Sequence, residues 1–340
     1  MKQIKVEDAV GSVLCHDITQ IIRGVTKDAV FRKGHVITEE DIPVLLSVGK
    51  EHIYVWEASE GMLHENDAAE ILRRISQGAH MHPSAVKEGK IELIADCDGL
   101  LKVDTVRLHA VNSLGEMMIA CRHGNFPVKK GDKIAGMRVI PLVIEEEKMR
   151  QAETLCGRKP LFQILPFGRI KAAVVTTGSE VYSGRIRDEF TPVVIGKLKE
   201  YEVEVIRTVT CNDDPAMTAE AVRGCLRDGA GLVICTGGMS VDPDDRTPLA
   251  IRSCADEVVT YGAPVLPGAM FMLAYASGIP VMGLPGCVMY AKRTIFDLVL
   301  PRVLAGERLG AEDFQCLGQG GLCLSCPVCT FPNCGFGKGA

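Results

Sequence analysis

The stretch GRIKAAVVTTGSE, residues 168–180, decides the fold class of this chain. Residues 170–176 form a continuous apolar run of small and β-branched side chains, which is typical of a strand buried on both faces. Thr177 and Gly178 follow the run, and Gly178 has hydroxyl side chains on both sides of it. Strands buried on both faces belong to parallel sheets covered by helices. The stretch therefore predicts an α/β domain that begins near residue 168.

The rest of segment 168–305 alternates strands with helices. Further strands are predicted at residues 203–209, 232–235, 258–259, 271–275 and 281–284. Helices are predicted to begin near Thr191, Asp213 and Thr247, where a capping residue precedes a proline, and a last helix is predicted over residues 289–300. Such alternation gives right-handed βαβ units and a mostly parallel sheet.

Length and composition exclude several classes of protein. The chain has 340 residues, of which 47% are hydrophobic and 24% charged, and its formal net charge is -5. At about 100–200 residues per domain, it holds two or three domains with cores of their own. A disordered, collagen-like or strongly basic protein is excluded, and binding of nucleic acid through bulk charge is not expected.

Residues 263–291 carry no charge, yet they are not expected to span a membrane. Prolines and glycines divide them into pieces too short to cross about 30 Å of hydrocarbon, so buried short strands and turns are predicted. The opening residues, MKQIKVEDAV, include acidic side chains where a signal peptide needs an apolar region. A cytoplasmic protein without membrane contact is expected.

Three further regions surround the α/β domain. Residues 1–57 are predicted to form a compact N-terminal segment, with a helix from Thr38 and a strand at residues 52–55. Residues 58–167 are predicted to form a β-rich middle region and linker, because glycines separate the short apolar runs between residues 91 and 144. Helices are predicted within it at residues 66–77 and 145–153. Residues 306–340 are a tail rich in cysteine and glycine.

The loop after the first strand is a candidate ligand-binding loop. Ligands of open parallel sheets bind beyond the carboxyl ends of the strands. There, Thr176-Thr177-Gly178-Ser179-Glu180 offers hydroxyls and backbone amides that can hold an anion. An ordinary strand-ending turn is the alternative for this loop taken alone.

The loop after the third strand, TGGMSVDPDDRTP at residues 236–248, combines two kinds of ligand group. Its first half is a glycine pair with flanking hydroxyls: Thr236, Gly237, Gly238 and Ser240. Its second half carries three carboxylates: Asp242, Asp244 and Asp245. The following helix N-terminus favours phosphate, which the carboxylates would repel unless a cation such as Mg²⁺ lay between them. The loop predicts a magnesium-assisted phosphate site, with a solvated acidic cap as the alternative.

Two more loops belong to the same edge of the sheet. Asn212-Asp213-Asp214-Pro215 follows the second strand, and one of its aspartates is explained as the cap of the next helix. The other aspartate has no such explanation. After the last strand, the turn Leu284-Pro285-Gly286 is expected to wall the same crevice.

Several other chemistries are excluded for this domain. No G-x-G-x-x-G follows a strand and no Walker A motif is present, which argues against ordinary dinucleotide and nucleotide folds. All eight histidines lie at or before His123, so residues 168–305 contain no Ser-His or Cys-His pair. His80 and His82 have no third ligand in view, and a solvated loop is the preferred interpretation.

Together, TTGSE, NDDP, TGGMSVDPDDRTP and the PG and LPG turns resemble the molybdopterin-binding domain of molybdopterin adenylyltransferases and of the MoeA and gephyrin type of molybdotransferase. The opening VEDAVGSVLCHDI resembles that of the molybdotransferases. The resemblance implies a three-layer α/β/α sandwich that holds molybdopterin. It also implies a homodimer, and a reaction that places molybdate on the dithiolene with loss of AMP and help from Mg²⁺.

The resemblance assigns roles residue by residue. Asp213 and Asp245 match the aspartates expected to be catalytic. The residues expected to bind molybdopterin are Thr177, Gly178, Ser179, Glu180, Thr236, Gly237, Gly238, Ser240, Pro285 and Gly286. Those expected to hold Mg²⁺ are Asp242, Asp244 and Asp245.

This sequence departs from the family pattern in three places. P-G-K-P appears as Pro267-Gly268-Ala269-Met270, which lacks a lysine, and L-P-G-N-P appears as Leu284-Pro285-Gly286-Cys287-Val288, which lacks an amide side chain. The residues after Ala305 are too few for the C-terminal β domain of the molybdotransferases, which is expected to be missing. Binding of molybdopterin is therefore better supported than turnover.

The 14 cysteines fall into two groups. Those between Cys15 and Cys287 are scattered through apolar segments and are predicted to be small, reduced core residues. The tail holds the others, with spacing C-x6-C-x2-C-x2-C-x4-C: Cys316, Cys323, Cys326, Cys329 and Cys334. Thiols this dense without apolar periodicity cannot build a core, so metal ligation is expected to organise the tail. An iron–sulfur cluster, Zn²⁺, and a free or disulfide-forming tail are the alternatives.

Three functional hypotheses follow. In the first, the chain is an enzyme that binds adenylylated molybdopterin and inserts molybdate with release of AMP. In the second, it is a carrier or sensor of molybdopterin whose cysteine tail responds to metal or redox state. In the third, the tail is a metal-assembled interaction element beside a vestigial pterin site. The expected partners are molybdopterin, molybdate, and a molybdenum or tungsten enzyme or another cofactor-assembly protein.

Overall fold

The computed structural model describes residues 2–22, 26–55, 61–240 and 245–339. The chain divides into two compact units. The first comprises Met1–Asp96, Val103–Arg122 and Lys130–Gln163. The second comprises Cys97–Lys102, His123–Lys129 and Ile164–Ala340, and it contains every candidate site residue named above.

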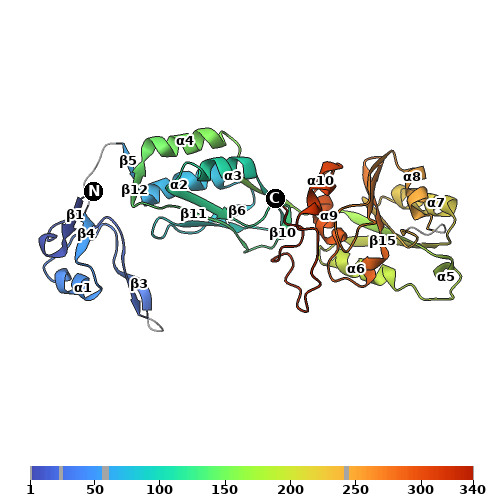
Figure 1. Ribbon diagram of the computed structural model, residues 1–340, viewed down its shortest axis with the longest axis horizontal. Coiled ribbons are helices and arrows are strands. Elements are labelled where there is room, and N and C mark those ends of the chain that lie inside the picture. The colour runs from blue at the N-terminus through green and yellow to red at the C-terminus, as the bar shows by residue number, and fades with distance from the viewer. Residues whose placement is uncertain (1, 23–25, 56–60, 241–244, 340) are drawn as a thin grey trace. The chain divides into compact units, whose positions relative to one another are not determined.

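A six-stranded sheet forms the centre of the second unit, in the order β15-β14-β16-β19-β18-β17 (Figure 1). The parallel strands are β14 (Lys171–Thr177), β15 (Glu204–Cys211), β16 (Leu232–Thr236) and β19 (Ile279–Leu284). The antiparallel strands at one edge are β17 (Glu257–Tyr261) and β18 (Met272–Ala276). The prediction of an α/β fold with a mostly parallel sheet is confirmed.

Helices cover both faces of this sheet. Side chains of a strand alternate between faces, so Ala172 and Val174 of β14 join one core cluster while Ala173 and Val175 join the other. The first face packs against α6 (Phe190–Lys199) and α9 (Ile295–Leu304), and the second against α7 (Pro215–Arg227) and α8 (Thr247–Cys254) (Figure 1). These layers make the three-layer sandwich that the resemblance implied.

Three helix starts differ from the sequence prediction. Helix α6 begins at Phe190, and the carboxylate of Asp188, rather than Thr191, accepts the first backbone amides. Thr247 is the first residue of α8, and its hydroxyl makes no cap. The predicted helix at 289–300 is a 3-10 turn, Gly286–Met289, followed by α9, which begins after the capping residue Thr294.

The uncharged stretch 263–291 contains β18, β19 and the Gly286–Met289 turn, as predicted. No helix in the part of the chain that the structure describes is long and apolar enough to cross a membrane.

The first unit begins with small antiparallel pairings. Strand β1 (Lys2–Lys5) pairs with β4 (His52–Val55), and β2 (Ile18–Ile22) pairs with β3 (Thr26–Phe31). A 3-10 turn, Val6–Asp8, follows β1, and α1 (Asp41–Ser47) precedes β4. The predicted helix begins at Asp41 rather than at Thr38, and the amide and hydroxyl of Thr38 donate to Asp41 at 2.8 and 2.9 Å.

The middle region holds three sheets. The four-stranded sheet contains β6 (Met81–Pro83), β7 (Ile91–Ala95), β11 (Lys133–Val139) and β9 (Met117–Cys121). The two-stranded sheet pairs β5 (Met62–His64) with β12 (Val143–Glu145). The three-stranded sheet contains β10 (Phe126–Val128), β8 (Gly99–Val103) and β13 (Phe162–Pro166). All of these strands lie within residues 58–167, the region for which β-structure was predicted.

Helices α2 (Glu65–Ser76) and α4 (Glu146–Cys156) of the middle region were predicted, but α3 (Thr105–Asn112) was not. Helix α3 buries only Val111, so it has no apolar stripe for periodicity to detect. Its sequence signal is the cap: the side chain of Asp104 accepts the amide of Arg107 at 2.9 Å.

The cysteines outside the tail are core or near-core residues, as predicted. Five are buried: Cys15, Cys156, Cys211, Cys225 and Cys235. Four are partly buried: Cys97, Cys121, Cys254 and Cys287. Burial raises the pKa of the Cys225 and Cys235 thiols, which suppresses the reactive thiolate form.

Alkylation should therefore separate the two groups of cysteine. In metal-free protein, iodoacetamide at about pH 8 is expected to label the exposed Cys316, Cys326 and Cys329 well before Cys225 and Cys235. Peptide mapping by mass spectrometry measures the order. Labelling of Cys235 as fast as Cys316 would contradict the buried position of the former.

Candidate functional site

A network of threonine hydroxyls lies at the carboxyl ends of β14 and β16. The Oγ1 atoms of Thr176 and Thr191 are 2.7 Å apart, and Thr236 donates to Thr176 at 3.1 Å. The Oγ1 atoms of Thr177 and Thr247 are 2.8 Å apart. Four of the five threonines are buried, Thr191 only partly. The network joins strand ends to the first turns of α6 and α8, so it fixes the loops of this edge relative to one another.

The glycine pair after β16 packs directly on the loop after β14. Gly237 has φ +82°, and a Cβ atom built on it would lie 2.2 Å from the carbonyl oxygen of Thr177. Gly238 has φ +51°, and its Cβ would lie 2.9 Å from Oγ1 of Thr247. Only glycine accepts both the positive φ and this close approach of two backbones. The contact between these loops therefore depends on the glycine pair.

The two aspartates after β15 have different partners. Oδ2 of Asp213 accepts the backbone amide of Ser179 at 2.9 Å, which ties this turn to the start of α5 (Ser179–Tyr182). Asp214 is the N-cap of α7 and accepts the amide of Ala216 at 3.0 Å. The prediction that one aspartate caps the helix is confirmed. The second one holds the neighbouring loop and keeps a carboxylate at the sheet edge.

Variants of the two aspartates should separate these roles. Asp214→Ala is expected to lower the free energy of unfolding by about 1 kcal/mol, because α7 loses its cap. Asp213→Asn keeps an acceptor oxygen for Ser179 and should stay within about 0.5 kcal/mol of wild type. Denaturant unfolding measures both. An equal loss in the two variants would mean that the charge of Asp213, rather than its hydrogen bond, holds the loop.

Four loops meet at one edge because the parallel strands end in register. Thr177 of β14 pairs with Cys211 of β15, and Thr176 of β14 pairs with Thr236 of β16. Thr236 in turn pairs with Leu284 of β19. The predicted residues at 177–180, 213, 236–238 and 285–286 therefore lie at or just after the ends of neighbouring strands.

The remaining predicted residues are placed less completely. Ser179, Glu180, Ser240 and Gly286 are exposed, Pro285 is buried, and Asp213 and Asp245 are partly buried. Asp242 and Asp244 lie outside the described residues. Within the described chain, no group of three or more His, Cys, Asp or Glu side chains is placed to hold a metal ion.

Sequence reasoning missed three residues that support this edge. Thr191 and Thr247 were interpreted as helix caps because each precedes a proline, yet their hydroxyls bond to Thr176 and Thr177. Met239 is 3% exposed, and a Cβ on Gly283 would lie 2.5 Å from its Cε atom. Met239 thus holds the loop after β16 against the core. The sequence signal for this burial was an apolar side chain within an otherwise polar loop.

The tail cysteines also separate in space. Cys323, Cys326, Cys329 and Cys334 line a common cavity. Cys316 is exposed and begins the 3-10 turn Cys316–Gly318, directly after α10 (Glu312–Gln315).

Two segments of the chain match known family models. Residues 173–305 match the model described as a probable molybdopterin binding domain. Residues 3–57 match the model described as Domain of unknown function (DUF8806). The second unit thus contains a segment similar to molybdopterin-binding domains. The closer likeness of the N-terminal segment to MoeA and gephyrin stays a prediction.

Curated relatives share only part of their length with this chain. A CinA-like protein of Mycobacterium tuberculosis (strain ATCC 25618 / H37Rv) is 33% identical over 90 residues. A CinA-like protein of Mycolicibacterium vanbaalenii is 34% identical over 90 residues. Each match covers 26% of this chain and 21% of the relative.

Solved structures that are similar to this one include a MoaB structure and a CinA structure. The molybdopterin biosynthesis enzyme MoaB from Thermus thermophilus is 20% identical, with a TM-score of 0.35, and the match covers 41% of this chain and 98% of that one. The protein CinA from Thermoplasma acidophilum, described as of unknown function, is 21% identical, with a TM-score of 0.30, and the match covers 34% and 88%.

Proposed function

We propose that the second unit binds molybdopterin at the edge formed by the loops after β14, β15, β16 and β19, and that the chain acts in molybdenum cofactor biosynthesis. The observation that carries the proposal is the packing of Gly237 on Thr177, which leaves no room for a side chain between the two loops. Glycine loops at a strand end present backbone amides to an anion such as a pterin phosphate. The family match over residues 173–305 supports the same ligand.

Magnesium fits the donor groups proposed for this edge. Asp213 uses one carboxylate oxygen for Ser179, and carboxylate oxygens are the ligands that Mg²⁺ prefers. We propose that Asp242, Asp244 and Asp245 supply these ligands, beside the catalytic Asp213. When bound, the ion would supply positive charge beside phosphate oxygens. The chain's own part is to hold the carboxylate of Asp213 next to the Ser179 loop.

The chemical outcome separates an enzyme from a carrier. In the enzyme, a molybdotransferase-like activity places molybdate on the dithiolene and releases AMP, with Asp213 and Asp245 as the catalytic pair. In the carrier or sensor, molybdopterin is held without turnover, and a tail that binds metal through its thiols reports metal or redox state. Two observations support the carrier or sensor. Tail thiols line a common cavity, and alanine stands at position 269, where the family pattern has a lysine.

One assay distinguishes these functions. The full chain is mixed with adenylylated molybdopterin, molybdate and Mg²⁺, and bound pterin and released AMP are measured together. Release that is lost in Asp245→Asn while binding persists supports the enzyme. Tight binding without release supports the carrier. Absence of binding would contradict both.

A homodimer and a molybdenum or tungsten enzyme as client remain part of the proposal. Sedimentation of the chain alone tests the dimer.

A further inference from the structure

The tail surrounds a cavity of about 450 Å³ in the second unit. Residues 290–293, just before α9, form one wall, and residues between 320 and 336 form the other. Four of the tail thiols line it: Cys323, Cys326, Cys329 and Cys334. Cys316 lies outside the cavity, with its Sγ atom 3.4 Å from the carbonyl oxygen of Asp313.

We propose that Cys323, Cys326, Cys329 and Cys334 ligate a [4Fe–4S] cluster in this cavity, and that Cys316 is not a ligand. The inference rests on the proposed metal binding by the tail and is independent of pterin binding. It makes two choices that the sequence left open, namely which four of the tail thiols bind and which metal group they hold.

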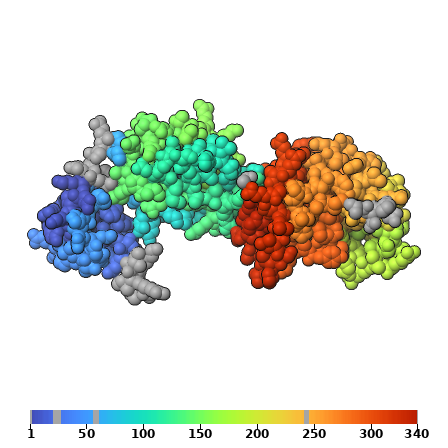
Figure 2. Space-filling model, in the orientation of Figure 1, coloured from blue at the N-terminus to red at the C-terminus, as the bar shows by residue number. Residues whose placement is uncertain are grey.

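The tail is folded on the domain core, which presents the thiols in fixed places. The amide of Cys323 donates to the carbonyl of Leu266 at 2.7 Å, and the amide of Leu266 donates to Gly321 at 2.8 Å. Phe336 is 4% exposed in the core, and a Cβ on Gly337 would lie 2.4 Å from Leu298. Figure 2 shows the tail, in red, as a continuous surface against the rest of this unit.

This packing corrects one expectation. The sequence predicted that the thiols, having no core of their own, would need metal to organise the tail. Phe336 instead joins the core of the α/β domain, and Gly337 lies so close to Leu298 of α9 that a Cβ on it would clash. Cys323 and Cys334 pack against that core, while Cys326 and Cys329 are exposed.

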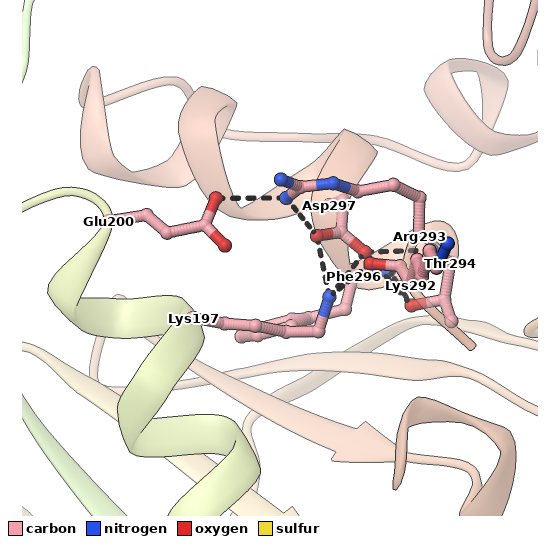
Figure 3. A network of polar contacts seen from close by, with 7 residues as sticks. All are labelled: Lys197, Glu200, Lys292, Arg293, Thr294, Phe296 and Asp297. Carbon is pink, nitrogen blue, oxygen red and sulfur yellow. Dashed lines mark hydrogen bonds and ion pairs between the residues drawn. The ribbon is translucent and has the colours of Figure 1, made fainter. Parts of the chain in front are cut away.

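Cationic side chains line the same cavity. Nζ of Lys292 donates to the carbonyl of Pro327 at 2.8 Å, and the guanidinium of Arg293 lies 5.1 Å from the ring centre of Phe331. Arg293 also forms ion pairs with Glu200 at 2.9 Å and with Asp297 at 2.8 Å (Figure 3). A cluster bound by four thiolates carries net negative charge, which cations in the wall stabilise.

The sequence spacing of the thiols and the size of the cavity favour a cluster over a single zinc ion. Zinc needs four ligands at about 2.0–2.3 Å from one point. Four tail thiols share one cavity of about 450 Å³, which has room for a group larger than a single ion. The cavity far exceeds the roughly 10–15 Å³ that one water needs. The C-x2-C-x2-C spacing of Cys323, Cys326 and Cys329 is also that of cluster-binding runs.

Anaerobic reconstitution of the full chain with ferrous iron and sulfide tests the inference. Wild type is expected to gain broad visible absorption and about four iron and four sulfide per chain. Cys316→Ser is the matched control and should load fully. The double variant Cys326→Ser/Cys329→Ser changes two exposed positions, so it should keep its thermal unfolding midpoint and lose the four-iron cluster.

Different failures would overturn different claims. Equal loss of iron in Cys316→Ser would refute the assignment of ligands. Stoichiometric binding of Zn²⁺ without any cluster would refute the cluster while metal binding by the tail survives. If the chain bound neither, both would fail, and molybdopterin binding, measured on the same samples, would be unaffected.

Labelling of thiols in the wild-type chain tests the same site without any substitution. Iodoacetamide should label Cys316, Cys326 and Cys329 in metal-free protein, but only Cys316 of these three after reconstitution. Unchanged labelling of Cys326 and Cys329 in loaded protein would contradict the proposed site.

Discussion

Gly237→Ala is expected to destabilise the second unit by about 3 kcal/mol. A left-handed backbone costs a non-glycine residue about 1–2 kcal/mol, and overpacking adds about 1–3 kcal/mol. Both costs apply, because Gly237 has φ +82° and its Cβ would lie 2.2 Å from the carbonyl oxygen of Thr177. A carbonyl in a strand end cannot swing away as a flexible side chain can, so the two loops must separate.

Gly184→Ala is the matched control for this variant. Gly184 also has positive φ, +72°, but a Cβ there would meet nothing within 4 Å. Its loss should be limited to the backbone cost of about 1 kcal/mol. Denaturant unfolding of both variants measures the difference, and equal losses would show that the contact between the loops contributes nothing.

Asp297→Ala is expected to lower the free energy of unfolding by about 3–5 kcal/mol, because it leaves the buried cation Lys197 without its anion. The carboxylate of Asp297 is 3% exposed and accepts from Nζ of Lys197 at 2.7 and 2.9 Å (Figure 3). It also accepts from Arg293 at 2.8 Å and from the amide of Thr294 at 2.7 Å, where it completes the capping box of α9. Alanine removes all of these bonds together.

A double-mutant cycle identifies the cause of that loss. Lys197→Met/Asp297→Ala removes a buried cation together with its anion and should be less destabilised than Asp297→Ala alone. Glu200→Gln changes a more exposed partner of Arg293 and should cost less than about 1 kcal/mol. Strictly additive losses in the cycle would contradict the buried pair. Asp297→Ala should also lower iron loading, since Arg293 in the cavity wall loses a support.

The fold could be predicted where burial alone decides it. Strands β14 and β16 are buried along nearly their whole length, so their apolar runs stand out in the sequence. Helix α3 buries one residue and left no such pattern. Thr191 and Thr247 carry a local capping signature, but tertiary hydrogen bonds to Thr176 and Thr177 use their hydroxyls instead.

The site could be predicted in kind but not in detail. Helix α7 needs only one aspartate as its cap, so the sequence indicated Asp213 as a site residue. Its hydrogen bond to the Ser179 amide could not be predicted, because it depends on the register of β14 on β15. The tail spacing indicated metal binding. Which thiols share a cavity depends on the packing of Phe336 and Gly337, and no spacing rule reveals it.

Hydrogen exchange of the full chain with and without molybdopterin tests the central claim most directly. The account predicts slower exchange of the amides at residues 177–180 and 236–240 on binding, with the tail amides unchanged. Molybdopterin that binds while these two loops exchange as fast as in the free chain would contradict it.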